Sequence, residues 1–349
     1  GITFNPGAGA FTLAGNALNL GGDVINLGPN AQAIDLPLTL DATNRAFFAW
    51  GGDIAVGGVI GQKIAGAALG IVKAGSNTLT LSGANTYTGL TTIGAGVLNV
   101  RNGAGLGATN TGATVSSGAA LELQGGIAIG AEALSLNGTG ITNAGALRNI
   151  SGDNSHSGPI TLGAASRVNS DAGKLTLGGN IVNVTYALTV GGAGDTELGG
   201  ALGSGTGGLV KDGSGTLTLS GTNSFTGAMT VQKGAVVLAG AGRIMPTGAG
   251  AIYLNEEGVL VLDNSGVNDT NRLAGALPGI TFQGGAFRFI GKAGEASLED
   301  LGVATFSGGA SAMDVVNGVG AGSSSEIRFS AAAFVNGMIK FTASNGTLG

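Results

Sequence analysis

Residues 71–100 read IVKAGSNTLTLSGANTYTGLTTIGAGVLNV, and this stretch decides the fold. Positions 78–81 within it alternate threonine with leucine. A period of two puts successive side chains on opposite faces of a strand, so we expect the leucines to point inward and the threonines outward. Ser82 and Gly83 then end the strand, because glycine supplies the positive φ that a tight turn requires.

The same pattern recurs once in strong form further along the chain. Residues 209–238 read LVKDGSGTLTLSGTNSFTGAMTVQKGAVVL, and about half of their positions are identical to those of the first copy. Weaker matches flank both copies, for example LTL at 38–40 with ITL at 160–162. The repetition divides the chain into N-terminal coils at 1–33, a first super-unit at 34–157, a second super-unit at 158–262 and irregular C-terminal β coils at 263–349.

The composition points to strands rather than helices. Glycine fills 71 of 349 positions without the three-residue period of collagen, and each interior glycine costs a helix roughly 1 kcal/mol relative to alanine. Hydrophobic residues make up 43% and charged residues 10%, which suits a packed core. Short strands cannot bury a face alone, but stacked coil on coil they enclose one apolar interior. The sequence therefore predicts an all-β parallel β-helix, or β-solenoid, of roughly 15 coils with about 20 to 25 residues each.

Both copies also carry a longer motif. A Gly-rich segment leads into T-L-T-L-S-G, an asparagine and an aromatic residue follow at the next turn, and a glycine precedes the following strand. In this the chain resembles the autotransporter-associated β-strand repeats, or passenger-associated repeats, of bacterial surface proteins. The matching positions are Leu79, Leu81, Gly83, Asn85, Tyr87, Gly89, Gly96, Leu217, Leu219, Gly221, Asn223, Phe225, Gly227 and Gly234. The resemblance implies a right-handed β-helix, exported to the outer cell surface or beyond, in which these residues are structural.

Charge and cysteine usage restrict the partners. Fifteen basic and twenty acidic residues give a formal net charge of −5, and the basic residues are scattered singly. Nucleic-acid binding needs a basic stripe, so no nucleic acid is expected as a partner. The absence of cysteine excludes a disulfide framework, a thiolate zinc site and a thiol nucleophile. Residues 46–72 are apolar, but Asp53 and Lys63 interrupt them before the ~20 residues of a membrane helix are reached, so we expect short strands and no membrane span.

His156 is the only histidine, and it lies close to Asp153, Ser155 and Ser157. These residue types resemble a catalytic triad. Adjacency in a loop that continues into Gly158 does not, however, place a base between a nucleophile and a carboxylate. We therefore expect this segment to be a solvated loop.

Two carboxylate pairs raise the question of glycoside chemistry. Glu256-Glu257 and Glu299-Asp300 are adjacent pairs, whereas glycoside hydrolysis needs two facing carboxyl groups roughly 5 to 10 Å apart. Adjacent residues of a strand point to opposite faces, so we expect each pair to keep a turn or an edge soluble. A polysaccharide lyase would need acidic and basic residues clustered on one external face, and the thinly spread charge predicts no such cluster.

Residues 51–53 (GGD) and 191–195 (GGAGD) resemble single fragments of calcium-binding β-helix repeats. No array of them follows, so we assign no catalytic, cofactor-binding or metal-binding residue and no cofactor. Aromatic rings can also stack on sugars, and five aromatics are candidates: Phe47, Phe48, Trp50, Tyr87 and Phe225. Because aromatics make up only 5% of the chain, we expect these residues to fill or cap the interior instead.

The sequence thus favours a non-catalytic, extracellular structural or adhesive β-solenoid. At about 4.8 Å per coil, such a stack would be about 70 Å long. Both ends of the sequence read as strands, at residues 1–4 and 339–342, without a polar cap. Uncapped strand edges template further pairing, so we expect head-to-tail self-association into a filament. The alternative is an extracellular β-helix that binds or cleaves polysaccharide, with surface glycans as its partners.

Overall fold

The computed structural model describes residues 1–109, 111–203, 205–245, 250–273 and 279–345. Within these ranges the backbone forms strands joined by turns, and the helical element present is a short 3₁₀ turn, η1 (Ile141–Asn143). The strands pair in parallel, apart from an isolated antiparallel bridge between Asn255 and Gly284. The predicted all-β β-solenoid is confirmed, while its right-handed sense and its number of coils stay predictions. The chain divides into two compact units, Gly1–Gly179 and Asn180–Gly349.

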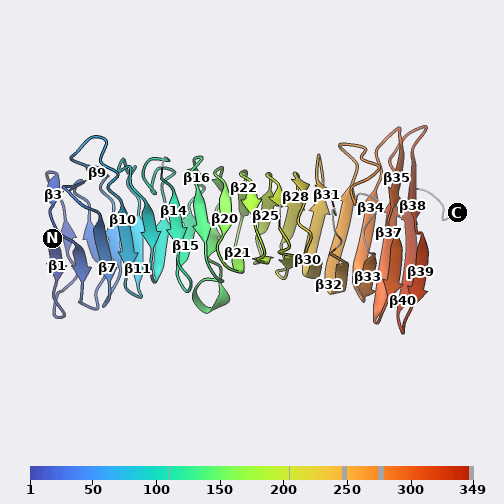
Figure 1. Ribbon diagram of the computed structural model, residues 1–349, viewed down its shortest axis with the longest axis horizontal. Coiled ribbons are helices and arrows are strands. Elements are labelled where there is room, and N and C mark those ends of the chain that lie inside the picture. Colours follow the sequence, from blue (N-terminus) through green and yellow to red (C-terminus); the bar gives the residue numbers. More distant parts are fainter. Residues whose placement is uncertain (110, 204, 246–249, 274–278, 346–349) are drawn as a thin grey trace. The chain divides into compact units, whose positions relative to one another are not determined.

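In the first unit the strands of successive coils lie side by side (Figure 1). One sheet runs β1 (Ile2–Phe4), β4 (Val24–Asn26), β7 (Arg45–Ala49), β10 (Ile71–Ala74), β12 (Thr91–Ile93), β14 (Ala113–Val115), β17 (Leu134–Leu136) and β20 (Ile160–Leu162). A second runs β2 (Thr12–Leu13), β5 (Gln32–Ile34), β8 (Ile54–Val56), β11 (Thr78–Leu81), β13 (Val97–Val100), β15 (Ala120–Gln124), β18 (Leu147–Ser151) and β21 (Ser166–Ser170). Shorter groups are β3 (Leu18–Leu20), β6 (Leu38–Leu40) and β9 (Ile60–Gln62), and β16 (Ala128–Ile129), β19 (Asn154–His156) and β22 (Lys174–Leu177).

The second unit repeats this arrangement with longer strands. One series is β24 (Leu188–Gly191), β27 (Leu209–Lys211), β30 (Met229–Leu238), β32 (Ile252–Asp263), β33 (Ile280–Gln283), β36 (Val303–Phe306) and β39 (Ala331–Phe334). A second series joins β25 (Asp195–Leu198), β28 (Thr216–Leu219), β34 (Ala286–Ile290), β37 (Ala310–Val316) and β40 (Met338–Ser344) to β30 and β32. Three pairs complete it: β23 (Ile181–Val182) with β26 (Leu202–Gly203), β29 (Thr222–Asn223) with β31 (Arg243–Ile244), and β35 (Ala296–Asp300) with β38 (Ser324–Arg328).

Aligned side chains of successive coils form the core. One column of the first unit is fully buried and consists of Leu79, Leu98, Leu121, Leu147 and Val168. The threonines that alternate with Leu79 are half-buried on the outer face, which confirms the inward direction predicted for the leucines. In the second unit a corresponding column is aromatic: the ring of Phe306 lies 4.8 Å from that of Phe282 and 4.9 Å from that of Phe334.

Coil length varies along the chain. Leu79 aligns with Leu98, 19 positions later, whereas Ile129 aligns with His156, 27 positions later. The interrupted apolar stretch at 46–72 contributes to four short strands, β7 to β10, as expected. None of the described residues builds a helix with the length and apolar character that a membrane crossing requires.

One expectation about strand ends is wrong. The motif predicts a short strand after Gly234, as after Gly96, which separates β12 from β13. Instead, β30 is a single strand of 10 residues that passes through Gly234. Gly234 has a positive φ of 74°, and β30 pairs with β27 before it, through residues 229–231, and with β28 after it, through residues 235–238. A positive φ therefore need not end a strand when the neighbouring coil supplies hydrogen bonds on both sides of the glycine.

Candidate functional site

The motif side chains of both repeat copies lie inside the stack. Four leucines have no exposed surface: Leu79, Leu81, Leu217 and Leu219. The turn aromatics are also interior, with Tyr87 0% and Phe225 3% exposed. The Tyr87 hydroxyl shares a 2.6 Å hydrogen bond with Oγ1 of Thr91, and burial raises the pKa of the phenol above its ordinary range. These side chains fill the core and are not accessible to an external ligand.

The motif glycines lie where consecutive coils touch. A Cβ would collide with the backbone of the preceding coil at Gly83, Gly89, Gly221 and Gly227. Gly96 and Gly234 meet the same obstacle and also have positive φ values of 67° and 74°. Any other residue at these two positions would combine a strained backbone with a steric clash.

The motif asparagines connect three coils each. Oδ1 of Asn85 accepts from the backbone N–H of Ile60 in the preceding coil (2.8 Å), and its Nδ2 donates to the carbonyl of Gly105 in the following coil (2.6 Å). In the second copy, Asn223 accepts from the N–H of Leu202 (2.9 Å) and donates to the carbonyl of Arg243 (2.9 Å). A buried amide satisfies a donor on one side and an acceptor on the other, which is why neither aspartate nor leucine could replace it.

A buried lysine accompanies each copy, and the sequence reading missed both. Nζ of Lys73 donates to the carbonyls of Ala74 (2.9 Å), Gly75 (2.8 Å) and Ala95 (2.9 Å). Lys211, at the equivalent position, donates to the carbonyls of Gly213 and Lys233. Burial lowers the pKa of Lys73 to about 8. The signal was available, because the lysine is identical in both copies of the repeat.

The expectation of a solvated loop around His156 is wrong. Asn154–His156 form strand β19, and the His156 side chain is 1% exposed. Its register partners, Ile129 and Leu177, are core residues, so the stack carries His156 inward with them. Neither ring nitrogen makes a well-aligned hydrogen bond, although the backbones of Glu132 and Gly158 lie close to the ring. Burial lowers the pKa of His156 to about 4, so the ring is neutral at pH 7.

Glu132 is a second buried titratable group in this part of the first unit. It is 2% exposed, and its Oε1 has no hydrogen-bond partner among the described residues. Burial raises the pKa of Glu132 to about 8, so the carboxyl is largely protonated at neutral pH. The arrangement is a buried acid without an opening to solvent, and it bears on stability rather than on catalysis.

The two predicted carboxylate pairs differ in outcome. Glu256 and Glu257 are exposed, as expected, although they lie within β32 and not at a turn. The expectation is wrong for Glu299, which is 0% exposed and accepts hydrogen bonds from the backbone N–H groups of Arg272 (3.1 Å) and Leu273 (2.8 Å). Burial raises the pKa of Glu299 to about 7. The carboxylate holds the segment before β33 against the core, a role that neighbouring residues in sequence do not reveal.

The aromatic candidates also divide. Phe47, Tyr87 and Phe225 fill the interior as expected, whereas Phe48 lies on the outer face and Trp50 is 54% exposed. The rings of Phe48 and Trp50 stack on each other at 6.1 Å. Phe48 follows the inward-pointing Phe47 on β7, so strand alternation puts it outside.

Both GGD-like fragments have a structural role. Oδ1 of Asp53 accepts from the backbone N–H of Thr78 in the next coil, and Oδ1 of Asp195 does the same for Thr216, each at 2.8 Å. Each aspartate thereby caps the start of the T-L-T-L strand. In the described part of the chain, no three His, Asp or Glu side chains gather closely enough to hold a metal ion.

Charged residues do cluster on one external face of the first unit, which contradicts the expectation from the sequence. Asn99, Glu122, Arg148 and Asn169 align across β13, β15, β18 and β21 as an outward column. They are 21 to 26 positions apart, one coil each, so the stacking register assembles what the sequence scatters. We call these four residues, together with Asp171, the polar column.

The polar column is linked from end to end by hydrogen bonds. Nη1 of Arg148 lies 3.1 Å from Oε1 of Glu122, and its Nη2 lies 2.5 Å from Oδ2 of Asp171. Asn99 donates to the other oxygen of Glu122 (3.1 Å), and Asn169 donates to the other oxygen of Asp171 (2.6 Å). The hydrogen bond that Arg148 donates to Asp171 raises the pKa of Arg148. One guanidinium thus pairs with two carboxylates, so these three side chains together carry a net charge of −1.

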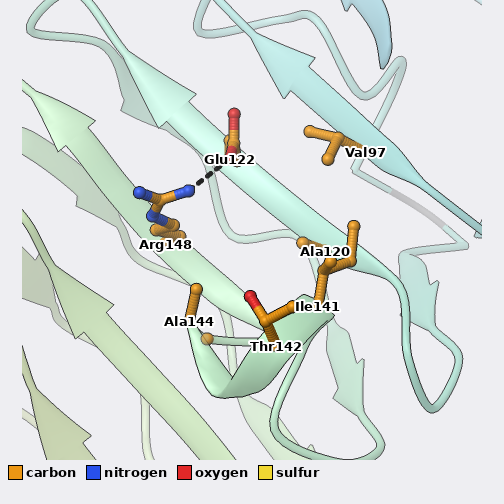
Figure 2. A pocket seen from close by; sticks show the side chains of 8 residues that line it. Val97, Ala120, Glu122, Ile141, Thr142, Ala144 and Arg148 are labelled. Atoms are coloured by element: carbon orange, nitrogen blue, oxygen red, sulfur yellow. Dashed lines mark hydrogen bonds and ion pairs between the residues drawn. The ribbon is translucent and has the colours of Figure 1, made fainter. Parts of the chain in front are cut away.

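A pocket of about 120 Å³ lies beside the polar column. Figure 2 shows Glu122 and Arg148 at one end of it and Ala120, Ile141 and Thr142 at the other. The turn η1 forms its wall, within a ten-residue connection from β17 to β18, whereas four residues connect β14 to β15. This longer connection, rich in glycine at 138, 140 and 145, is the sequence feature that signals the pocket.

Comparison with known families identifies the repeats. The family model of the passenger-associated-transport-repeat matches the chain twice, at residues 71–100 and 209–238. The resemblance read from the motif is thereby confirmed for both copies. No curated protein and no solved structure matches the chain.

Proposed function

We propose that this chain, built around two passenger-associated-transport repeats, is an autotransporter-passenger-like scaffold that acts outside the cell and without catalysis. The observation that supports it best is the position of the repeats. In both copies the lysine, the asparagine and the glycines are bound into the contacts between coils. Such residues specify a stack of coils and not a reaction. Resistance of stacked coils to proteases suits an extracellular location.

Export is tested on intact cells that produce the protein. Antibodies against the chain should label unpermeabilised cells or the medium, whereas antibodies against a cytoplasmic marker should label only permeabilised cells. Labelling that needs permeabilised cells would contradict an extracellular role.

Head-to-tail self-association is the second part of the proposal. Strands β39 and β40 of the second unit leave Phe334, Met338 and Phe341 exposed by 60%, 70% and 46%. Phe334 already extends the aromatic column of Phe282 and Phe306, so one more coil would bury it on both sides. A coil from a second copy would satisfy both the apolar side chains and the strand edges.

Self-association is measured by light scattering over a wide concentration range, with negative-stain microscopy for fibres. Phe334→Glu should keep the chain monomeric, because it places a charge in the contact. Val319→Glu is the matched control, since Val319 is 74% exposed in a turn outside these strands. Monomeric wild-type protein at every concentration would rule the assembly out.

Contact with surface glycans is a second candidate role, and the polar column favours it. Carboxylate, guanidinium and amide groups lie together on one face and are held in place by one another. Binding is favoured over cleavage, because Arg148 pairs with both carboxylates. A glycan array probed with the whole chain tests this role, and the absence of binding to every glycan on the array would rule the role out.

A further inference from the structure

We propose that the pocket beside the polar column binds a single neutral pyranose unit of a glycan, an inference that rests on the glycan-contact role proposed above. The pocket is built in the first unit between η1 and the outer faces of β13, β15 and β18. Its shape, its lining and its backbone geometry each support this ligand.

The wall of the pocket suits the C–H face of a sugar ring. Five of its eight lining residues are apolar or glycine: Val97, Ala120, Ile141, Ala144 and Gly145. Val97 and Ala120 present methyl groups from two strands, and Ile141 and Ala144 present methyl groups from η1 and the residue after it (Figure 2). A pyranose has one face made of C–H groups, and small-molecule sites are typically apolar with a few polar groups that fix orientation.

The polar end of the pocket suits the ring hydroxyls. Glu122 and Arg148 keep 13% and 32% of their side-chain surface exposed while they pair with each other. A pair of vicinal hydroxyls can donate to the carboxylate and accept from the guanidinium at the same time. Asn99 holds Glu122 in place and Asp171 holds Arg148, so both side chains lose little conformational entropy when a ligand binds. Glu122, Arg148 and Asp171 together carry a net charge of −1, so a neutral sugar is favoured over a uronate.

The turn η1 has a conformation that needs an explanation. Thr142 and Asn143 have positive φ values of 49° and 64°, a region that a β-branched residue rarely adopts. Gly140 and Gly145 approach so closely at the base of the turn that a Cβ on Gly140 would collide with the Gly145 carbonyl. Strained residues that the surrounding structure fixes in this way occur often at ligand sites. Here the strain places Thr142 in the wall of the pocket.

The volume limits the ligand to one ring. A pocket of about 120 Å³ is smaller than the sites that enclose drug-sized ligands, so one sugar unit enters and its neighbours in a glycan stay outside. We expect weak binding of a monosaccharide, with a Kd of about 1 mM. Several such contacts along a glycan and several copies of the chain would raise the apparent affinity.

The first unit also supplies a matched control pocket. It measures about 160 Å³ and includes Ala113, Ala133, Ser135 and Thr161 in its lining, which holds no charged residue. Ala133→Leu fills this control pocket, and Ala144→Leu fills the proposed site. Both positions are at the surface, so both variants are expected to fold.

The test uses saturation-transfer NMR on the full chain with methyl glycosides of a neutral hexose, a 6-deoxyhexose, an N-acetylhexosamine and a hexuronate. We expect transfer to at least one neutral glycoside, loss of at least tenfold in affinity for Ala144→Leu, and wild-type binding for Ala133→Leu. Glu122→Gln should also weaken binding. Circular dichroism confirms that each variant is folded.

The outcomes separate the site from the wider role. Equal binding by Ala144→Leu and wild type, or transfer to the hexuronate alone, would overturn the site. If the glycan array also gives no signal, the glycan-contact role fails with it. If the array gives signals that Ala144→Leu retains, the role stands and the pocket is not its site.

Discussion

At the scale of single residues, Lys73 and Lys211 bind neighbouring coils together from within the stack. A buried ammonium is expensive to desolvate, and the lowered pKa of Lys73 reflects this. The carbonyls of Ala74, Gly75 and Ala95 offset the expense, because they come from two consecutive coils and would otherwise lack a donor. The lysine thus stabilises a turn whose carbonyl groups converge on its Nζ atom.

We expect Lys73→Ala to lower the free energy of unfolding by about 2–4 kcal/mol, because it leaves a cavity and unpaired carbonyls. Lys63→Ala is the matched control. Lys63 forms an exposed ion pair with Asp41, and its loss should change stability by less than about 1 kcal/mol. Denaturant unfolding followed by circular dichroism measures both variants. Equal effects would show that the buried contacts of Lys73 do not matter.

Glu132 makes stability depend on pH. Burial raises its pKa from 4.5 to about 8, so the folded chain holds the proton more tightly than the unfolded chain. Its contribution to stability is complete below pH 4.5 and is lost as the pH rises through 8. Glu132→Gln should therefore be more stable than the wild type at pH 9, by roughly 1–3 kcal/mol, and equal to it at pH 4.5. Chemical unfolding at the two pH values checks this, and a difference that does not change with pH would contradict it.

His156 acts in the opposite direction. Burial lowers its pKa from 6.5 to about 4, so its contribution is complete above pH 6.5 and is lost as the pH falls through 4. Together the two groups predict that the first unit is most stable at intermediate pH and loses stability in both acid and alkali. Neither effect was visible in the sequence, because each depends on which coil faces the residue.

At the scale of elements, the asparagine of the motif replaces strand pairing at the corners between strands. Asn85 supplies an acceptor to Ile60 and a donor to Gly105, at a corner where no strand of its own coil is present. Asn223 makes the same two kinds of hydrogen bond, to Leu202 and Arg243, although it lies in β29, which pairs with β31. The corners are therefore continuous hydrogen-bonded columns, as the sheets are.

Asn85→Ala is expected to destabilise the first unit by about 1–3 kcal/mol, because it leaves a buried N–H and a buried carbonyl unpaired. Asn30→Ala provides the control, since Asn30 is exposed and its side chain donates a hydrogen bond to the Ala8 carbonyl of the preceding coil. Its effect should be within about 0.5 kcal/mol. Thermal unfolding compares the two, and an equally small effect of both would refute the corner role of Asn85.

The elements also show how far the sequence can be read. Alternation in 78–81 was enough to predict strand β11 and the inward direction of Leu79 and Leu81, because a strand has a fixed period. The polar column was not predictable in the same way. Coil length varies from 19 to 28 positions, so the register that brings Glu122 beside Arg148 cannot be counted from the chain. The burial of His156 was missed for the same reason.

At the scale of the whole molecule, stacking makes stability local. Each coil contacts the coils before and after it, so the free energy of unfolding is approximately a sum of terms between neighbours. The aligned column through Leu79, Leu98 and Leu121 shows this arrangement directly, since Leu98 packs between one residue of each adjacent coil. A defect in one coil should therefore weaken its neighbours first.

Leu98→Ala tests this locality. The substitution removes a fully buried side chain and should cost about 2–5 kcal/mol where it acts. Amide hydrogen exchange should then lose protection in β11, β13 and β15, while strands further along the chain, such as β32, keep theirs. A two-state protein would instead lose protection everywhere by the same amount, because its most protected amides exchange only through global unfolding. A uniform loss would thus contradict the neighbour-by-neighbour description, whereas a loss confined to three coils would establish that this solenoid opens in segments.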